Sequence, residues 1–174
     1  MIMKKTMLAS LLLALTVSIS TAAGDEWMTD FEAAKQKAAA ENKDLLVDFT
    51  GSDWCGWCIK LVDEVFKHDA FKKGVADNFV LVELDFPQDK SKLDESTQKQ
   101  NELLKEKYSI QGFPTILLLD HQGRPYAQTG YQAGGPEKYL THLDGLLAVK
   151  KQRDKAFSAA EKLEGTAKAQ ALVA

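Results

Sequence analysis

Cysteine and histidine are both scarce in this sequence of 174 residues, which contains two of the former and three of the latter. A small secreted domain that depends on disulfides for its stability carries more than two cysteines, so a disulfide-rich scaffold is excluded. The three histidines, His68, His121 and His142, are scattered along the chain and complete no zinc ligand set with the cysteines. We therefore expect no metal site and no stabilising network of disulfides.

Positive charge is also in deficit. The chain has 22 Lys and Arg residues against 25 Asp and Glu residues, a formal net charge of −3 at pH 7. A surface that binds nucleic acid or anionic lipid concentrates basic residues, and this sequence has no such excess. We therefore expect neither nucleic acid nor a membrane surface among its partners.

A long apolar run is absent too. The run from Met7 to Ile19 has about a dozen residues, whereas a membrane-spanning helix takes roughly 20. Lys4 and Lys5 precede it and four small residues, Ser20 to Ala23, follow it, which is the order of a secretory signal peptide. We expect residues 1–23 to be this signal, cleaved after Ala22 or Ala23, and the mature protein to be periplasmic or secreted. Loss of the two lysines takes the net charge from −3 to −5.

The remaining chain is long enough for one domain with a sizeable core, which we assign to residues 24–150. Its hydrophobic pattern predicts four strands, over about 45–49, 79–85, 115–119 and 126–129. The first strand is apolar without alternation, which is typical of a central strand covered on both faces. Residues 151–174 are polar and rich in alanine, and we expect a loosely held helix or tail there.

Helices are expected between and around the strands. The sequence predicts one from about 30 to 42, one after the cysteines, a short one over 70–76, one that ends near 108 and one that opens at 134. The first helix begins with Thr29 and Glu32, which have the spacing of a capping box. The polar segment 87–100 is expected to be solvated. The order α-β-α-β-α-β-β-α belongs to the α/β class.

The helix after the cysteines shows one apolar face. Its members recur at helical spacing: Cys58, Val62, Val65 and Phe66. Charged residues occupy the other positions, so this face is expected to pack against the sheet.

The two cysteines are spaced for redox chemistry. Cys55 and Cys58 stand in the segment Trp54-Cys55-Gly56-Trp57-Cys58, between the first predicted strand and the following helix. A thiolate at the first turn of a helix is stabilised by the helix dipole and by free backbone N–H groups, and a second thiol one turn away can resolve a mixed disulfide. The segment therefore indicates thiol-disulfide exchange.

The sequence argues against two other uses of the cysteines, a structural disulfide and haem attachment. A structural disulfide closing so small a ring contributes only about 2 kcal/mol on the loop-entropy model, against about 3 kcal/mol for a 15-residue loop. Ile59, which follows Cys58, excludes the haem attachment motif Cys-x-x-Cys-His.

Three features together resemble the thioredoxin fold. These are the strand with an internal acid, the cysteine segment at a helix start, and the break Gly112-Phe113-Pro114-Thr115 before a strand and hairpin. More narrowly, residues 49–58 resemble exported bacterial thioredoxin-like proteins and the soluble domains of thiol:disulfide interchange proteins. The resemblance spans residues 27 to 148. It implies a thioredoxin-like three-layer sandwich, with a mixed central sheet of about four strands flanked by helices.

The resemblance also implies roles for residues of the site. Cys55 would be the exposed nucleophile and Cys58 the more buried resolving thiol. Pro114 would be a cis-proline beside the disulfide, where the backbone of Phe113 can pair with an extended substrate. Asp48 matches the buried acid of the family, and burial should raise its pKa so that it takes the proton of Cys58 during resolution.

The remaining expectations concern the surroundings of the disulfide. Trp54, Gly56 and Trp57 are expected to belong to the substrate-facing rim. Glu83 stands where thioredoxin has a lysine, and an acid there should raise the pKa of Asp48 if the two are close. One residue more than in thioredoxin separates Asp48 from Cys55.

Two classes of function follow from these patterns. The first is an exported, monomeric thiol:disulfide oxidoreductase that reduces or rearranges disulfides of secreted cysteine-containing proteins. It would need no cofactor beyond its own dithiol, and a membrane protein could donate its electrons. The second is a binding or chaperone module in which the Cys55–Cys58 disulfide is only structural. Within the first class the direction of electron flow stays open, because it depends on the reduction potential.

Overall fold

The computed structural model of the protein describes residues 27–166. The expected signal peptide and the end of the alanine-rich tail lie outside this range. In chain order the elements are helix α1 (Phe31–Glu41), strand β1 (Asp44–Thr50), helix α2 (Gly56–Leu61), π-helix η1 (Val62–Phe66), helix α3 (Asp69–Val75), strand β2 (Phe79–Asp85), 3-10 helix η2 (Lys90–Lys92), helix α4 (Glu95–Lys107), strands β3 (Thr115–Leu119) and β4 (Pro125–Thr129), and helix α5 (Gly135–Ala160).

The four strands form one mixed sheet in the order β2-β1-β3-β4. Strand β1 pairs parallel with β2 and antiparallel with β3, and β3 pairs antiparallel with β4. Every residue of β1 is buried, as its apolar run predicts for a central strand. The expected mixed four-stranded sheet is confirmed.

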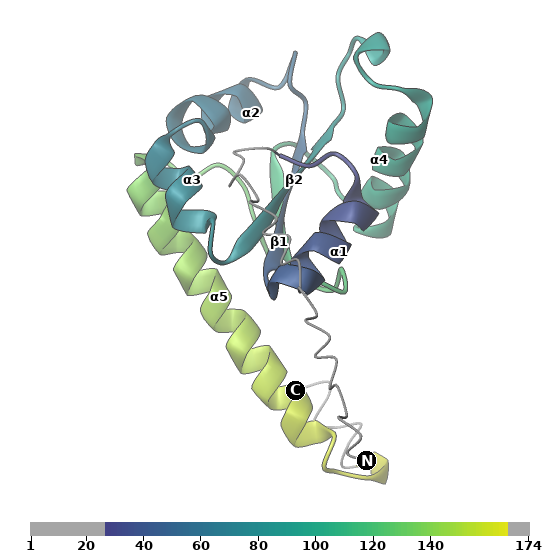
Figure 1. Ribbon diagram of the computed structural model, residues 1–174, viewed down its shortest axis with the longest axis vertical. Coiled ribbons are helices and arrows are strands. Elements are labelled where there is room, and N and C mark those ends of the chain that lie inside the picture. The colour runs from purple at the N-terminus through teal and green to yellow at the C-terminus, as the bar shows by residue number, and fades with distance from the viewer. Residues whose placement is uncertain (1–26, 167–174) are drawn as a thin grey trace, which may run out of the picture.

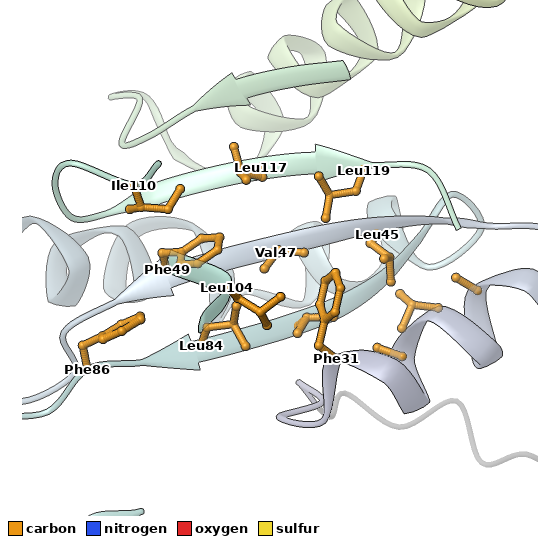
Figure 2. Packing of buried hydrophobic residues seen from close by; sticks show 14 residues of the cluster. Phe31, Leu45, Val47, Phe49, Leu84, Phe86, Leu104, Ile110, Leu117 and Leu119 are labelled. Carbon is orange, nitrogen blue, oxygen red and sulfur yellow. The ribbon is translucent and has the colours of Figure 1, made fainter. Parts of the chain in front are cut away.

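Helices cover both faces of the sheet, which confirms the three-layer sandwich (Figure 1). Successive residues of a strand point to opposite faces. Leu45, Val47 and Phe49 of β1 accordingly pack in one core with residues of α1 and α4, and Figure 2 shows this packing around Phe31. Leu46 belongs to the other core, which α2, η1, α3 and α5 share. The cysteines are therefore attached to the layer opposite α1.

The start of α1 differs from the expected capping box. The N-cap is Asp30, whose side chain accepts a hydrogen bond from the N–H of Ala33 at 2.9 Å. Gln100 of α4 explains the shift by one residue, because its amide accepts from the N–H of Phe31 at 3.0 Å and donates to the carbonyl of Thr29 at 2.8 Å. This bridge leaves Thr29 outside the helix, so the prediction of a Thr29 cap was wrong.

The apolar face after the cysteines also differs at one position. Val65 and Phe66 are buried as predicted, but 38% of Val62 is exposed. The chain switches from α to π geometry here, and the N–H of Lys67 bonds to the carbonyl of Val62 at 3.1 Å, five residues back. The wider π turn breaks the 3.6-residue period, and so Val62 leaves the buried face.

Helix α5 continues well beyond Lys150, to Ala160, and projects past the sheet in Figure 1. Its N-terminal half carries the expected apolar stripe, with Tyr139 and Leu143 fully buried in the second core. Within residues 27–166, no helix combines the length and apolarity needed to cross a membrane.

Candidate active site

The redox centre lies where β1 leads into α2. Cys55 and Cys58 are joined by a disulfide, with Cα atoms 5.2 Å apart. Cys55 is the N-cap of α2, and its sulfur accepts a hydrogen bond from the N–H of Cys58 at 3.2 Å. Both cysteines are buried, with exposed fractions of 6% for Cys55 and 2% for Cys58. The expectation that Cys58 is the more buried of the two is confirmed, but the expectation of an exposed Cys55 was wrong for the disulfide form. In the reduced protein the same N–H would stabilise a thiolate on Cys55.

Asp48 lies inside the molecule, on the sheet face that α2 covers. It lies two residues after Leu46 of the second core along β1 and therefore points to the same face of the sheet, and only 2% of it is exposed. Its Oδ1 atom has no hydrogen-bond partner among the described residues. Burial raises the pKa of Asp48 well above its ordinary value of 3.8, and the charges of Glu83 and Asp85 add to this. The predicted raised pKa is confirmed.

Glu83 is the direct neighbour of Asp48 on the parallel strand β2. Residues in register on parallel strands point to the same face, so both carboxyl groups lie on the α2 side. Burial, followed by the charge of Asp85, raises the pKa of Glu83 as well. The expected effect of Glu83 on the pKa of Asp48 is therefore present.

The loop before the disulfide, residues 51–55, is tied to the end of β2. Ser52 donates from its N–H and its hydroxyl to Asp85, at 2.8 and 2.6 Å. The indole N–H of Trp54 donates to the carbonyl of Phe86 at 2.8 Å. A Cβ atom on Gly51 would lie only 2.6 Å from the Trp54 ring, so glycine is needed for this packing. We call residues 51–55 the cysteine loop.

An aromatic row flanks one side of the cysteine loop. Trp54 packs edge-on against Phe113 at 5.7 Å between ring centroids, and Phe113 packs against Phe86 at 5.1 Å. The bond from Phe113 to Pro114 is cis, as the resemblance implies. Because Phe49 pairs with Thr115, this proline stands beside the end of β1 from which the cysteine loop leaves.

A second aromatic group surrounds Trp57, in the first turn of α2. Trp57 packs against Tyr131 at 5.2 Å, and the Lys60 ammonium lies 5.2 and 5.1 Å from the centroids of these two rings. Tyr131 donates a hydrogen bond to Glu64, which also pairs with Lys60 at 3.7 Å. This network holds Trp57 in place although 58% of it is exposed.

The outer surface around the disulfide is apolar and open. Among the described residues, half of the large hydrophobic side chains that are exposed fall within nine positions: Trp54, Trp57, Ile59 and Val62. A Cβ atom on Gly56 would meet no other atom within 4 Å, so the space above the N-terminus of α2 is free for a partner. The surface can accept an apolar polypeptide next to Cys55.

The structure therefore assembles the predicted site residues around one loop, and adds others. Tyr131, Phe86 and Asp53 were missed by the sequence interpretation. Tyr131 lies far along the chain, and no local pattern links it to the cysteines. Asp53 carried a weak signal as a charged residue two positions before Cys55. In the described part of the chain, no group of three or more His, Cys, Asp or Glu side chains is placed to hold a metal ion.

Comparisons with known proteins agree with this arrangement. The family model of the thioredoxin-like domain matches residues 31–146. The disulfide bond reductase DsbH of Chlamydia pneumoniae is 34% identical over 129 residues, which cover 74% of this chain and 76% of that protein. The thioredoxin-related protein DsbJ of the same organism is 35% identical over 153 residues, 80% of this chain but only 44% of that protein.

Solved structures give the same assignment. A structure described as DsbH oxidoreductase superimposes with a TM-score of 0.67 at 32% identity, over 71% of this chain and 84% of the other. A thioredoxin from Thermus thermophilus superimposes with a TM-score of 0.53 at 15% identity, over 70% of this chain and 86% of the other, and shows the fold alone.

The chain belongs to the thioredoxin-like family. With its paired cysteines at the start of α2, it is a thiol:disulfide oxidoreductase of this family.

Proposed function

We propose that this protein is an exported reductase, which transfers electrons from a membrane donor to disulfides of secreted proteins. The observation that carries the proposal is the hydrogen bond from the Cys58 N–H to the Cys55 sulfur at the N-cap of α2. This geometry stabilises a thiolate on Cys55 and leaves Cys58, one turn away, to resolve the mixed disulfide. The name of the relative DsbH supports the reducing direction.

The proposed reaction has two exchange steps. The Cys55 thiolate attacks one sulfur of the substrate disulfide, forms a mixed disulfide and releases the other substrate sulfur as a thiolate. Cys58 then gives its proton to the Asp48 carboxylate and attacks the Cys55 sulfur, which restores the internal disulfide and releases the second substrate thiolate. The substrate gains two electrons, and a donor dithiol must later reduce the Cys55–Cys58 disulfide.

The proposed surface for the substrate consists of the features around Cys55. The exposed Trp54 and Trp57 rings belong to residues next to the cysteines in sequence, the space above Gly56 is open, and the backbone beside Pro114 can pair with an extended chain. Export rests on the N-terminal residues, whose order is that of a signal peptide. Mass spectrometry of the exported protein should find its N-terminus at Ala23 or Gly24, and an intact Met1 would contradict export by this signal.

Insulin reduction tests the catalytic role. The mature protein should catalyse the reduction of insulin by dithiothreitol, and Cys55→Ser should abolish this activity. Absence of turnover in the wild type would favour the alternative, a binding module with a structural disulfide.

A trapping experiment tests the division of labour between the two sulfurs. Cys58→Ala should attack substrate disulfides without releasing them, so that mixed disulfides on Cys55 accumulate in cells and disappear with a reducing agent. Secreted multi-cysteine proteins in these complexes would identify the substrates, and a membrane protein would identify the donor. If Cys58→Ala traps nothing while Cys55→Ala combined with Cys58→Ala keeps full cellular activity, the catalytic proposal is wrong.

A further inference from the structure

Asp53 is the residue through which the polar segment after β2 holds the cysteine loop. Its Oδ1 atom accepts a hydrogen bond from the N–H of Gln88 at 2.9 Å. Its Oδ2 atom accepts from the N–H of Asp89 at 3.3 Å and from the ammonium of Lys92 at 2.9 Å. One side chain two residues before the Cys55 sulfur thus joins three groups of another segment. We call residues 86–92 the clamp segment.

The contacts of Asp53 belong to a continuous connection between the two segments. The N–H of Phe86 bonds to the carbonyl of Thr50 at 2.9 Å, Ser52 bonds to Asp85, and the Trp54 indole bonds to Phe86. Within the part of the chain that the structure describes, Asp53 is the only residue of the cysteine loop that binds Gln88, Asp89 and Lys92. The far half of the clamp segment is therefore attached to the cysteine loop through this carboxylate.

The carboxylate is ionised at every relevant pH. The N–H of Gln88 and the Lys92 side chain are the main causes that lower the pKa of Asp53 to about 2. Hydrogen bonds to an ionised acceptor are stronger than those between neutral groups. The connection therefore persists across the pH range in which thiol-disulfide exchange takes place.

We propose that Asp53 is a positioning residue for the exchange reaction, which holds the cysteine loop on the clamp segment and thereby keeps the Cys55 sulfur at the N–H of Cys58. Cys55 is held on its other side by the bond from its N–H to the carbonyl of Gly51 at 2.9 Å. A nucleophile held in this way needs little reorganisation, and a misplacement of about 1 Å can cost about 100-fold in rate. The inference rests on the proposed role of Cys55 as the attacking thiolate.

Two variants of Asp53 separate position from charge. Asp53→Ala removes all three contacts, and we expect it to lower kcat/KM for insulin by at least about tenfold. We also expect it to raise the pH midpoint for alkylation of Cys55 in the reduced protein, because the thiolate loses its ordered N–H donor. Asp53→Asn keeps an acceptor oxygen for Gln88 but replaces the oxygen that accepts from Asp89 and Lys92 by an amide NH2 group, so both changes should have the same direction as in Asp53→Ala and be smaller. Partial rescue by asparagine identifies a positioning role.

The opposite pattern would overturn the proposal. If Asp53 acted only through its charge, both variants would lower the alkylation midpoint of Cys55, since a nearby negative charge disfavours a thiolate. Wild-type behaviour of Asp53→Ala in turnover and alkylation would also reject it. Asp63→Ala is the matched control, because Asp63 is an exposed acid on η1 that pairs with Lys67 at 2.9 Å. It should leave both measurements unchanged.

The readouts also distinguish this inference from the proposed function. Failure of the wild type to reduce insulin would reject the function, whereas alkylation of Cys55 requires no turnover and still tests Asp53. Circular dichroism and the melting temperature establish that each variant is folded. If Asp53→Ala does not fold, Lys92→Ala removes one anchor and keeps the carboxylate. It should then show a smaller loss of kcat/KM in the same direction, and wild-type activity would reject the proposal.

Discussion

Asp48 is buried with one oxygen atom unpartnered and has two acids beside it, which makes folding sensitive to pH. Its pKa is raised in the folded state, so the folded protein binds more protons than the unfolded chain above about pH 4. Stability must therefore fall as the pH rises from about 4 toward the raised pKa, by up to about 1.4 kcal/mol per pH unit for one proton. Below pH 4 both states are protonated and the effect vanishes.

Asp48→Asn should remove this dependence. We expect urea unfolding of the variant to give a free energy that declines less with rising pH than that of the wild type, with the difference opening above about pH 4. If the two proteins show parallel profiles between pH 4 and 8, Asp48 does not titrate with a raised pKa.

Glu83→Gln tests the coupling between the two carboxyl groups. Removal of the Glu83 charge should lower the pKa of Asp48 toward its ordinary value, so that more Asp48 is ionised at neutral pH. Because ionised Asp48 is the proposed acceptor of the Cys58 proton, the resolution of a mixed disulfide should reach its half-maximal rate at lower pH. Stopped-flow measurement of substrate release over a pH series checks this. Glu102→Gln on α4 should leave the profile unchanged, and an unshifted profile in Glu83→Gln would contradict the coupling.

At the scale of single residues, the sequence supplies the reacting groups but not those that hold them. Cys55, Cys58 and Asp48 could be predicted because each belongs to a short local motif or matches the family pattern. Tyr131 and Phe86 could not, since their positions beside Trp57 and Trp54 come from how distant segments fold together. Supporting contacts of this kind have no signal within a single stretch of sequence.

The π turn η1 changes the surface beside the disulfide. It turns Val62 outward near Ile59, one helical turn from Cys55, so an apolar strip leads away from the sulfur. A substrate polypeptide that reaches Cys55 would cover part of this strip. Partial burial of one Ile or Val side chain stabilises the complex by about 1 kcal/mol, which corresponds to about a fivefold gain in affinity.

Ile59→Ser and Val62→Ser should each raise KM for insulin by about fivefold, with kcat unchanged. Their reactivity with dithiothreitol should stay within twofold of the wild type, because a small dithiol does not cover the strip. Val149→Ser, which changes an exposed apolar residue of α5 away from the disulfide, is the control. Equal losses of activity toward insulin and toward dithiothreitol would indicate that the substitution disturbs the disulfide and does not remove a contact surface.

At the scale of elements, the predicted bounds agree best with the structure where burial alone determines which residues form the element. The four strands lie within one residue of their predicted ranges. For β1 and β3 this agreement follows from their full burial, which gives an unambiguous apolar run. The exceptions depend on tertiary contacts. Gln100 moves the start of α1 by one residue, and the π geometry of η1 exposes Val62. Neither effect is visible in local propensity or period.

For the molecule as a whole, charged groups tie the turn of α5 that holds Lys150 and Arg153 to the sheet. Lys150 pairs with Asp44 at the start of β1 at 3.4 Å. Arg153 donates to Asp120 after β3 at 3.2 Å, and its guanidinium lies 5.5 Å from the Tyr126 ring on β4. The sequence interpretation ended the domain at residue 150, but these contacts join the next turn of the helix to three strands or their ends. We therefore expect this turn of α5 to stabilise the folded domain.

Arg153→Ala should therefore destabilise the domain. Asp120 is 2% exposed, and Arg124 and the backbone N–H groups of its turn remain to bind it after the loss of Arg153. We expect the free energy of unfolding to fall by about 1.5 to 3 kcal/mol, the range for a hydrogen bond to a charged group, together with a fall in Tm of roughly 2–4 °C per kcal/mol. Lys155→Ala, at an exposed position on the same helix, should change the stability by less than about 0.5 kcal/mol. Equal stabilities of the two variants in urea unfolding would mean that α5 ends functionally near residue 150, as the sequence alone suggests.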